Sequence, residues 1–144
     1  MSNRDIMKAI KANKQRRHSM TYQENYQKWV DFADLPDYLR QDLINMDEKT
    51  KEDAFYTNLE FGTAGMRGLI GAGTNRINIY VVRQATEGLA RLIESKGGNE
   101  KERGVAIAYD SRHFSPEFAF ESAAVLAKHG IKSYVFESLR PTPE

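Results

Sequence analysis

The stretch VAIAYDSRHFSPEFA, residues 105–119, decides the fold class of this protein. It begins with a nearly unbroken apolar run, Val105–Tyr109, which is typical of a parallel strand that is buried on both faces. A polar loop follows, and then the start of a helix. Ser115 is predicted to cap this helix, with Pro116 in the first helical position and Glu117 facing the positive end of the helix dipole.

The residues after this stretch complete a βαβ unit. The predicted helix, Phe118–His129, ends at Gly130, and a second apolar run, Lys132–Phe136, predicts a second strand. A strand, a helix and another strand in this order indicate two parallel strands joined by a right-handed crossover. We therefore expect an α/β fold.

A longer helix is predicted before this unit. Asn78 is expected to cap it after the turn Asn75–Asn78, and Gly97 is expected to end it. The charged stretch Asn99–Arg103 predicts a loop, and Met66–Ala72 is compatible with a strand. One apolar face runs along the helix and consists of Ile79, Val82, Ala85, Leu89, Leu92 and Ile93.

Residues 20–58 predict a helical segment ahead of the α/β part. Asp34 and Pro36 resemble the cap and the first turn of its second helix. The polar stretch Asp47–Lys51 predicts a turn, and Glu52–Asn58 predicts a short third helix. Apolar residues recur at helical spacing in the first two helices: Tyr22, Tyr26, Trp29 and Val30, then Leu35, Leu39, Leu43 and Met46.

The first nineteen residues, 1–19, differ from the rest of the chain in charge. They carry a net charge of +5 and the remaining residues carry −4, which leaves +1 for the whole chain. The segment lacks the long apolar stretch and the cleavage site of a secretory signal. Its polarity favours a basic, disordered extension outside the fold. A solvated basic helix and a nucleic-acid-binding arm are the alternatives.

Composition excludes several classes of protein. The 144 residues are the length of one ordinary domain. No apolar run reaches the roughly eighteen residues that a membrane-spanning helix needs, and the mildly acidic body has no basic stripe that would bind nucleic acid. The chain contains no cysteine, which excludes disulfides and thiolate catalysis and agrees with a cytoplasmic location.

A glycine-rich stretch, LEFGTAGMRG at residues 59–68, is the first candidate site. Glycine allows positive φ and lets backbone N–H groups approach an anion closely. The planar guanidinium of Arg67 suits phosphate or carboxylate. Thr63, Gly65 and Arg67 therefore suit an oxyanion site, and a tight turn with a surface arginine is the alternative. The spacing matches neither a dinucleotide-binding motif nor a P-loop.

A second candidate site lies where the strand Val105–Tyr109 ends. Ligand sites gather at the carboxyl ends of strands in open α/β sheets, and Asp110 and Arg112 stand at such an end. They either pair with each other to fix the loop or contact a substrate. The neighbouring His113 is interpreted as a solvated loop residue. In the sequence, no group of His, Cys, Asp and Glu has the spacing of a metal site.

Four motifs in register carry a family resemblance: LEFGTAGMRG, NRIN, VAIAYDSRHFSPEFA and RPTPE. In this order they resemble the first domain of the α-D-phosphohexomutases, and among these the bacterial phosphoglucomutases of the phosphomannomutase-like branch. The resemblance covers residues 20–144 and leaves 1–19 outside. It implies an incomplete first domain over 59–144, a mixed sheet with flanking helices, preceded by the helical segment 20–58.

The resemblance also implies a reaction. Members of this family interconvert 1-phospho and 6-phospho sugars through a phosphoserine and a bisphosphorylated intermediate. Their four domains surround a cleft, Mg²⁺ is bound in the second domain, and glucose 1,6-bisphosphate is the activator. The motifs place Thr63, Gly65 and Arg67 near the phosphoserine, and Asp110 and Arg112 in the loop after the buried strand. Hexose phosphates are the implied partners, and oligomeric state is left open.

Three parts of the family pattern have no counterpart in this sequence: the serine motif of the type T-A-S-H-N-P, the aspartates that bind the metal and the phosphate-binding loop of the last domain. Thr142, Pro143 and Glu144 resemble a helix start at which the chain stops. We therefore expect an N-terminal fragment, truncated before the phosphoserine loop and inactive alone, with no catalytic residue of its own. A stand-alone sugar-phosphate or anion-binding module and a non-catalytic relic are the alternatives. Sugar recognition, glucose or mannose, is implied to lie in another domain.

Overall fold

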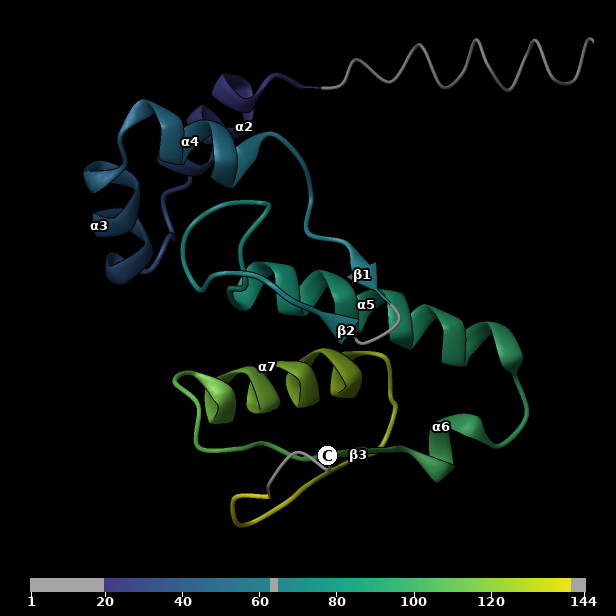
Figure 1. Ribbon diagram of the computed structural model, residues 1–144. Coiled ribbons are helices and arrows are strands. Elements are labelled where there is room, and N and C mark those ends of the chain that lie inside the picture. The colour runs from purple at the N-terminus through teal and green to yellow at the C-terminus, as the bar shows by residue number, and fades with distance from the viewer. Residues whose placement is uncertain (1–19, 63–64, 141–144) are drawn as a thin grey trace, which may run out of the picture.

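The computed structural model describes residues 20–62 and 65–140. The expectations for the basic extension 1–19, for Thr63 and for the helix start at Thr142 therefore lie outside the described residues. In the described ranges the chain forms six helices and four short strands, so the α/β class is confirmed (Figure 1). In chain order they are α2 (Tyr22–Val30), α3 (Asp37–Asn45), α4 (Glu48–Phe55), β1 (Phe61–Gly62), β2 (Gly65–Met66), α5 (Ile79–Lys96), α6 (Glu100–Arg103), β3 (Val105–Ile107), α7 (Ser115–Lys128) and β4 (Ser133–Val135).

The first two helices of the N-terminal segment are confirmed, and one predicted cap is wrong. Helix α2 begins at a capping box, in which the side chains of Thr21 and Glu24 each accept a hydrogen bond from the other residue's backbone N–H. Helix α3 begins at Asp37, and Pro36 occupies its cap position without a side-chain hydrogen bond. The cap predicted at Asp34 is therefore wrong, and the fixed φ of Pro36 suits the start of the helix.

The third helix begins earlier than predicted. Asp47 accepts the Thr50 backbone N–H at 2.8 Å and caps α4, which starts at Glu48 and not at Glu52. The turn predicted at Asp47–Lys51 is therefore wrong. A polar stretch was interpreted as a turn, whereas a capping aspartate makes the same polar residues the exposed first turn of a helix.

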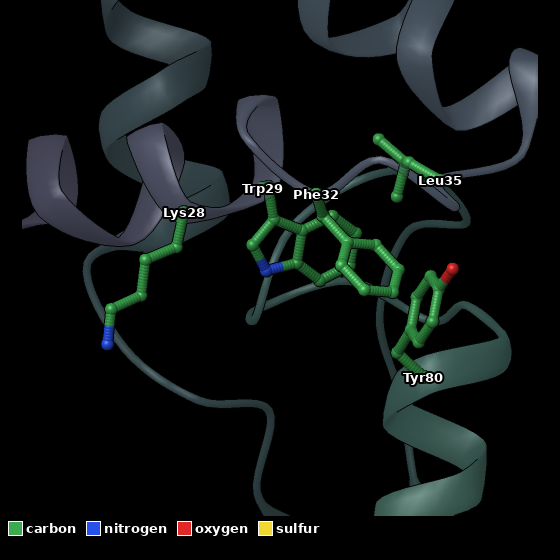
Figure 2. A pocket seen from close by; sticks show the side chains of 5 residues that line it. All are labelled: Lys28, Trp29, Phe32, Leu35 and Tyr80. Carbon is green, nitrogen blue, oxygen red and sulfur yellow. The ribbon is translucent and has the colours of Figure 1, made fainter.

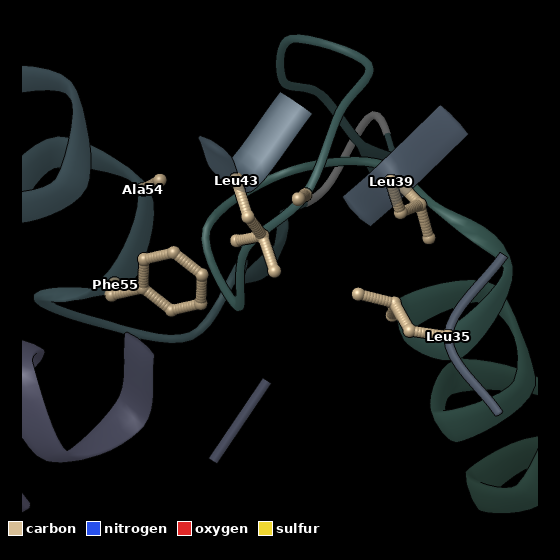
Figure 3. Close-up of a cluster of buried hydrophobic side chains, with 6 residues drawn as sticks. Leu35, Leu39, Leu43, Ala54 and Phe55 are labelled. Atoms are coloured by element: carbon tan, nitrogen blue, oxygen red, sulfur yellow. The ribbon is translucent and has the colours of Figure 1, made fainter. Parts of the chain in front are cut away.

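A closed core holds the N-terminal helices together (Figure 3). Phe55 is fully buried, and the rings of Tyr26 and Trp29 meet it edge-on at centroid distances of 5.6 and 5.8 Å. Figure 3 shows Leu43 extending toward Phe55 between the helices. The buried residues of this first core are Leu35, Leu39, Leu43, Ala54, Phe55 and Ala72.

The turn before α5 is fixed by Asn78, as its predicted capping role requires. The Asn78 side chain accepts the backbone N–H groups of Tyr80 and Val81 and donates to the carbonyls of Gly71 and Gly73. It is 1% exposed. One buried amide therefore joins the start of α5 to the preceding loop.

Arg76, in the same turn, ties that loop to α4. Its guanidinium contacts the Asp53 carboxylate at 2.6 Å and is 9% exposed. On the other side of the loop, the Asp42 carboxylate of α3 accepts the Ala72 backbone N–H at 2.7 Å. The NRIN motif is thus a structural tie between the helical segment and α5.

The glycine-rich stretch forms a hairpin and not a longer strand. Strands β1 and β2 pair antiparallel, with Phe61 opposite Met66. Beyond them, a single bridge joins Ile70 to Ile77. Of the stretch Met66–Ala72, which was compatible with a strand, only Met66 lies in a strand, and Ile70 forms a single bridge.

Strands β3 and β4 pair parallel, which confirms the order predicted for the βαβ unit. The predicted burial is wrong, because Ala106 is exposed and its partner Tyr134 is 57% exposed. Only one face of the two strands is covered, since α7 packs there and contacts β4. Figure 1 shows α5 and α7 side by side, with β3 next to α7. A second core between them contains Ala90, Leu126 and Ile131.

Three details of this part differ from the expectation. Asn99–Arg103 contains the one-turn helix α6 and is not a plain loop. Leu89 and Leu92 of the predicted apolar face of α5 are 40% and 54% exposed, because α7 covers a different face. Ser115 is not the cap of α7 but its first residue, and Phe114 occupies the cap position.

Candidate functional site

The hairpin presents Arg67 to solvent. Arg67 follows β2 directly and is exposed, and within residues 20–62 and 65–140 no hydrogen bond or ion pair engages its guanidinium. Gly65 has a φ of 88°, a backbone conformation that favours glycine. Thr63, the third residue of this candidate site, lies outside the described residues. The arrangement leaves a planar cation available at the end of a tight turn.

A hollow of about 300 Å³ lies between the hairpin and α5. Phe61 and Met66 line it from the hairpin, and Val81, Ala85 and Gly88 line it from the helix. Phe61 is nevertheless 75% exposed. Apolar side chains of the hairpin and of α5 therefore face one hollow, and Arg67 directly follows Met66, one of the residues that line it.

Asp110 and Arg112 form a pair in the loop after β3. Arg112 Nε donates to Asp110 Oδ2 at 2.7 Å, and the Arg112 backbone N–H donates to Asp110 Oδ1 at 3.1 Å. The Arg112 side chain is 80% exposed, whereas that of Asp110 is 16% exposed. The structural pairing considered for these two residues is thus present, and the guanidinium still faces solvent.

Ser115 fixes the same loop from the helix side. Its hydroxyl accepts the Asp110 backbone N–H at 3.2 Å, and its own backbone N–H donates to the Arg112 carbonyl at 3.0 Å. The hydrogen bond from the Arg112 backbone N–H, followed by that from its guanidinium, lowers the pKa of Asp110 below the ordinary value. Asp110 is therefore a fixed carboxylate that orients Arg112.

The two candidate loops are separate. In Figure 1 the β1–β2 hairpin lies along the middle of α5, whereas the loop after β3 leads into the N-terminal end of α7. No hydrogen bond or ion pair joins Arg67 to Arg112 in the part of the chain that the structure describes. The structure thus presents two exposed arginines in two loops.

An apolar pocket lies elsewhere, in the N-terminal segment (Figure 2). It has a volume of about 280 Å³ and is lined by Lys28, Trp29, Phe32, Leu35 and Tyr80. Figure 2 shows the three rings gathered together and the Lys28 amino group extending away from them. None of the residues predicted for the site lines this pocket.

The loop histidine and the helix-end histidine have different surroundings. His113 is exposed, as interpreted, and its ring lies 4.2 Å from that of Phe114. His129 Nε2 lies 2.8 Å from Glu87 Oε2, and His129 Nδ1 lies 3.2 Å from Glu94 Oε1. The Glu87 and then the Glu94 carboxylate raise the pKa of His129. The two carboxylates are two turns apart on α5, so they lie on the same side of the helix. This spacing can be read from the sequence.

Neither a metal cluster nor a membrane helix is found among residues 20–62 and 65–140. No three His, Asp or Glu side chains gather there as metal ligands would. No helix in those ranges has both the length and the apolar character to span a bilayer.

Comparison with known proteins identifies the family. The model of "Phosphoglucomutase/phosphomannomutase, alpha/beta/alpha domain I" matches residues 58–144. A phosphoglucomutase of Staphylococcus epidermidis is 38% identical over 117 residues, which are 81% of this chain and 20% of that protein. A phosphopentomutase of Mus musculus is 36% identical in an alignment of 111 residues that covers 73% of this chain and 18% of that protein.

The matches cover most of this chain but only a small part of its relatives. This chain spans about a fifth of the length of the curated relatives it matches. No solved structure matches it. The matched range begins one residue before the LEFGTAGMRG motif and includes all four motifs on which the resemblance was based. The chain therefore belongs to the phosphoglucomutase/phosphomannomutase family and carries the domain I part of its members.

Proposed function

We propose that this chain is the N-terminal part of a phosphohexomutase and that the exposed arginines of its two candidate loops, Arg67 and Arg112, bind the phosphate groups of a hexose phosphate. The observation that carries the proposal is Arg67: an exposed guanidinium, unpaired within the described residues, next to the turn glycine Gly65. An arginine that stabilised the fold would be paired, as Arg76 is. An unpaired planar cation suits a phosphate that arrives with the substrate.

Phosphoryl transfer relies on positioning and on charge stabilisation more than on covalent chemistry by the protein. Arg67 supplies one positive charge for this purpose. Arg112 supplies a second guanidinium whose direction Asp110 fixes. The phosphoserine and the Mg²⁺ ligands of the family pattern are proposed to lie in other parts of a longer protein.

The chain alone is proposed to be inactive, with glucose 1,6-bisphosphate acting only on the complete enzyme. A sugar-phosphate or anion-binding module remains the second candidate, because Arg67 and Arg112 are sufficient to attract phosphate. The name of the mouse relative adds a pentose phosphate to the substrates worth testing. The absence of cysteine supports a cytoplasmic location.

The test is a coupled assay on this chain and on the longer protein that its coding sequence continues into. Both are assayed with glucose 1-phosphate, mannose 1-phosphate and ribose 1-phosphate, in the presence of Mg²⁺ and glucose 1,6-bisphosphate. The longer protein is expected to turn over one of the sugars and the 144-residue chain none. A stop codon directly after Glu144 would favour the binding module, and turnover by the chain alone would contradict the proposal.

In the longer protein, Arg67→Ala is expected to lower kcat/KM by about ten- to a thousandfold, the scale of losing one charge-stabilising donor. Arg91→Ala is the matched control, because Arg91 is also exposed and pairs only with Glu87 within its own helix. Normal turnover of Arg67→Ala would contradict the role of this arginine.

A further inference from the structure

Phe114 adopts a backbone conformation that its side chain does not favour. Its φ is 63° and its ψ is 2°, the left-handed region, and among the described residues it is the only non-glycine with positive φ. Such a conformation is costly for a bulky residue and persists where the surrounding structure enforces it. Residues of this kind cluster at functional sites. Phe114 directly follows the loop that carries Asp110 and Arg112.

Aromatic contacts from two elements hold this residue in place. Its ring stacks on Tyr38 at a centroid distance of 5.2 Å and an interplanar angle of 25°. It also stacks on Phe118, one turn further along α7, at 5.9 Å and 30°. Tyr38 belongs to α3, so the N-terminal helical segment supports a residue that lies 76 positions later, at the start of α7.

The conformation of Phe114 sets the geometry of the loop. Ser115, the next residue, binds both the Asp110 backbone N–H and the Arg112 carbonyl. The φ and ψ of Phe114 therefore decide where Ser115 lies relative to that loop. If Phe114 relaxed to negative φ, Ser115 would turn away, and the pair of Asp110 and Arg112 would lose its support from α7.

We infer that Phe114, supported by Tyr38, is a positioning residue that holds the Arg112 guanidinium in the direction in which it meets a bound phosphate. Phe114 touches no substrate and acts only through Ser115 and Asp110. The helical segment of residues 20–58 thus has a role in the site as well as in the core. This inference rests on the proposed function, because it requires Arg112 to bind phosphate.

The first measurement needs no activity. Amide hydrogen exchange is followed by mass spectrometry on the 144-residue chain with Tyr38→Ala, Tyr38→Phe or Phe114→Gly. Tyr38→Ala and Phe114→Gly are expected to speed exchange of the 110–115 amides by about tenfold or more while the α7 amides stay protected, since a local opening is involved. Tyr38→Phe keeps the stacked ring and is the matched control. Phe114→Gly removes the ring, and glycine tolerates the positive φ, so the fold is retained; because glycine adopts negative φ as readily, the loop is no longer held in one conformation.

The second measurement is a titration of the same variants with inorganic phosphate, followed by the NMR resonance of Arg112 Nε. Tyr38→Ala and Phe114→Gly are expected to weaken binding by about tenfold, the scale of one charged hydrogen bond. In an Arg112→Ala background, where the Arg67 Nε resonance reports binding, the same changes should have no further effect. Tyr38→Phe should bind as the unchanged chain does.

The outcomes separate this inference from the proposed function. Unchanged exchange at 110–115 in Tyr38→Ala and Phe114→Gly overturns the inference, whatever the phosphate data show. Faster exchange with unchanged phosphate affinity also overturns it, because the ring contacts would then be packing only. If the unchanged chain shows no phosphate response at Arg112, the proposed role of this loop fails and the positioning role fails with it.

Discussion

The two cores of this chain differ in how completely they are closed. The first core gathers aromatic and aliphatic side chains from α2, α3, α4, the start of α5 and the loops beside them, and all six of its buried residues are at most 5% exposed. The second core has three buried residues, and its other neighbours are only partly buried. Several helices and loops can enclose a set of large side chains from all sides, whereas a two-stranded sheet with a helix on one face leaves the other face in water.

The two cores also differ in the polar side chains that link the segments around them. Buried side chains, Asn78 and Arg76, cross-link the segments around the first core. Around the second core, α5 and α7 are linked by the half-exposed ion pair of Arg83 with Glu121 and by one hydrogen bond between the hydroxyls of Thr86 and Ser122. Half-exposed pairs contribute little to stability. We therefore expect the first core to dominate the free energy of unfolding.

The largest effect is expected for Phe55→Ala. Removing this fully buried ring should lower the free energy of unfolding by about 3–5 kcal/mol, through lost burial and the cavity left behind. Urea unfolding followed by circular dichroism measures it. Trp29, the single tryptophan, contacts Phe55, so its fluorescence reports the same core directly. Tyr56→Ala, at a neighbouring position that is 61% exposed, is the control.

Leu126→Ala tests the second core in the same way. Leu126 is 1% exposed, but its neighbours Ile93, Val105 and Ile107 are partly buried and able to move into the space. We expect a loss of about 2–3 kcal/mol, at the lower end for a buried leucine. A loss that exceeds that of Phe55→Ala in the same urea experiment would reverse the comparison of the two cores.

Asn78→Ala tests the buried polar tie. The change removes two donated and two accepted hydrogen bonds and leaves backbone groups of Gly71 and Gly73 without them. We expect a loss of about 2 kcal/mol, from the cap and from unsatisfied carbonyls together. Asn99→Ala is the control, because Asn99 stands before α6 without a side-chain cap. Equal stability of the two variants would show that the tie does not hold the loop.

A smaller, pH-dependent effect is expected at the link between α5 and α7. Glu87 and then Glu94 raise the pKa of His129 in the folded protein. The contribution of this histidine to the free energy of unfolding is therefore complete below the unfolded pKa of about 6.5 and is lost as pH rises through the folded value. The lowered pKa values of Glu87 and Glu94 act in the opposite direction at acid pH.

The measurement is the urea midpoint between about pH 6 and pH 9, a range in which only the histidine of this cluster changes charge. The urea midpoint of the unchanged chain should fall with rising pH, because His129 loses its charge beside the two carboxylates. His129→Gln should flatten this dependence of the midpoint on pH. Glu87→Gln should flatten it in part, because Glu94 remains. An unaltered slope in His129→Gln would place the pH dependence elsewhere.

The smallest effect on stability is expected for Arg67→Ala. Arg67 is exposed and has no ion pair within the described residues, so its removal should change the free energy of unfolding by less than about 0.5 kcal/mol. Arg76→Ala, which removes a buried guanidinium and its ion pair with the exposed Asp53, is the contrasting variant and should be clearly destabilised. Similar losses in both would show that Arg67 belongs to the fold and not to a site.

The elements that the sequence predicted best are those with a strong local signal. The cap at Asn78, the end of α5 at Gly97 and the parallel order of β3 and β4 were all predicted and are confirmed. A capping amide, a glycine and an apolar run each act over a few residues, so their effect is visible in a short window of sequence. The family could be identified from the sequence for a similar reason, because each of the four motifs is a short stretch of residues.

Contacts between distant segments were decided only by the tertiary structure. The sequence gives no sign that Arg76 is buried against Asp53, or that Tyr38 stacks on Phe114. Ser115 was predicted to cap α7, but the left-handed Phe114 takes that position and turns the Ser115 hydroxyl to the Asp110 backbone. Which face of a helix or strand is covered depends on what lies against it, and periodicity within one element does not contain that information.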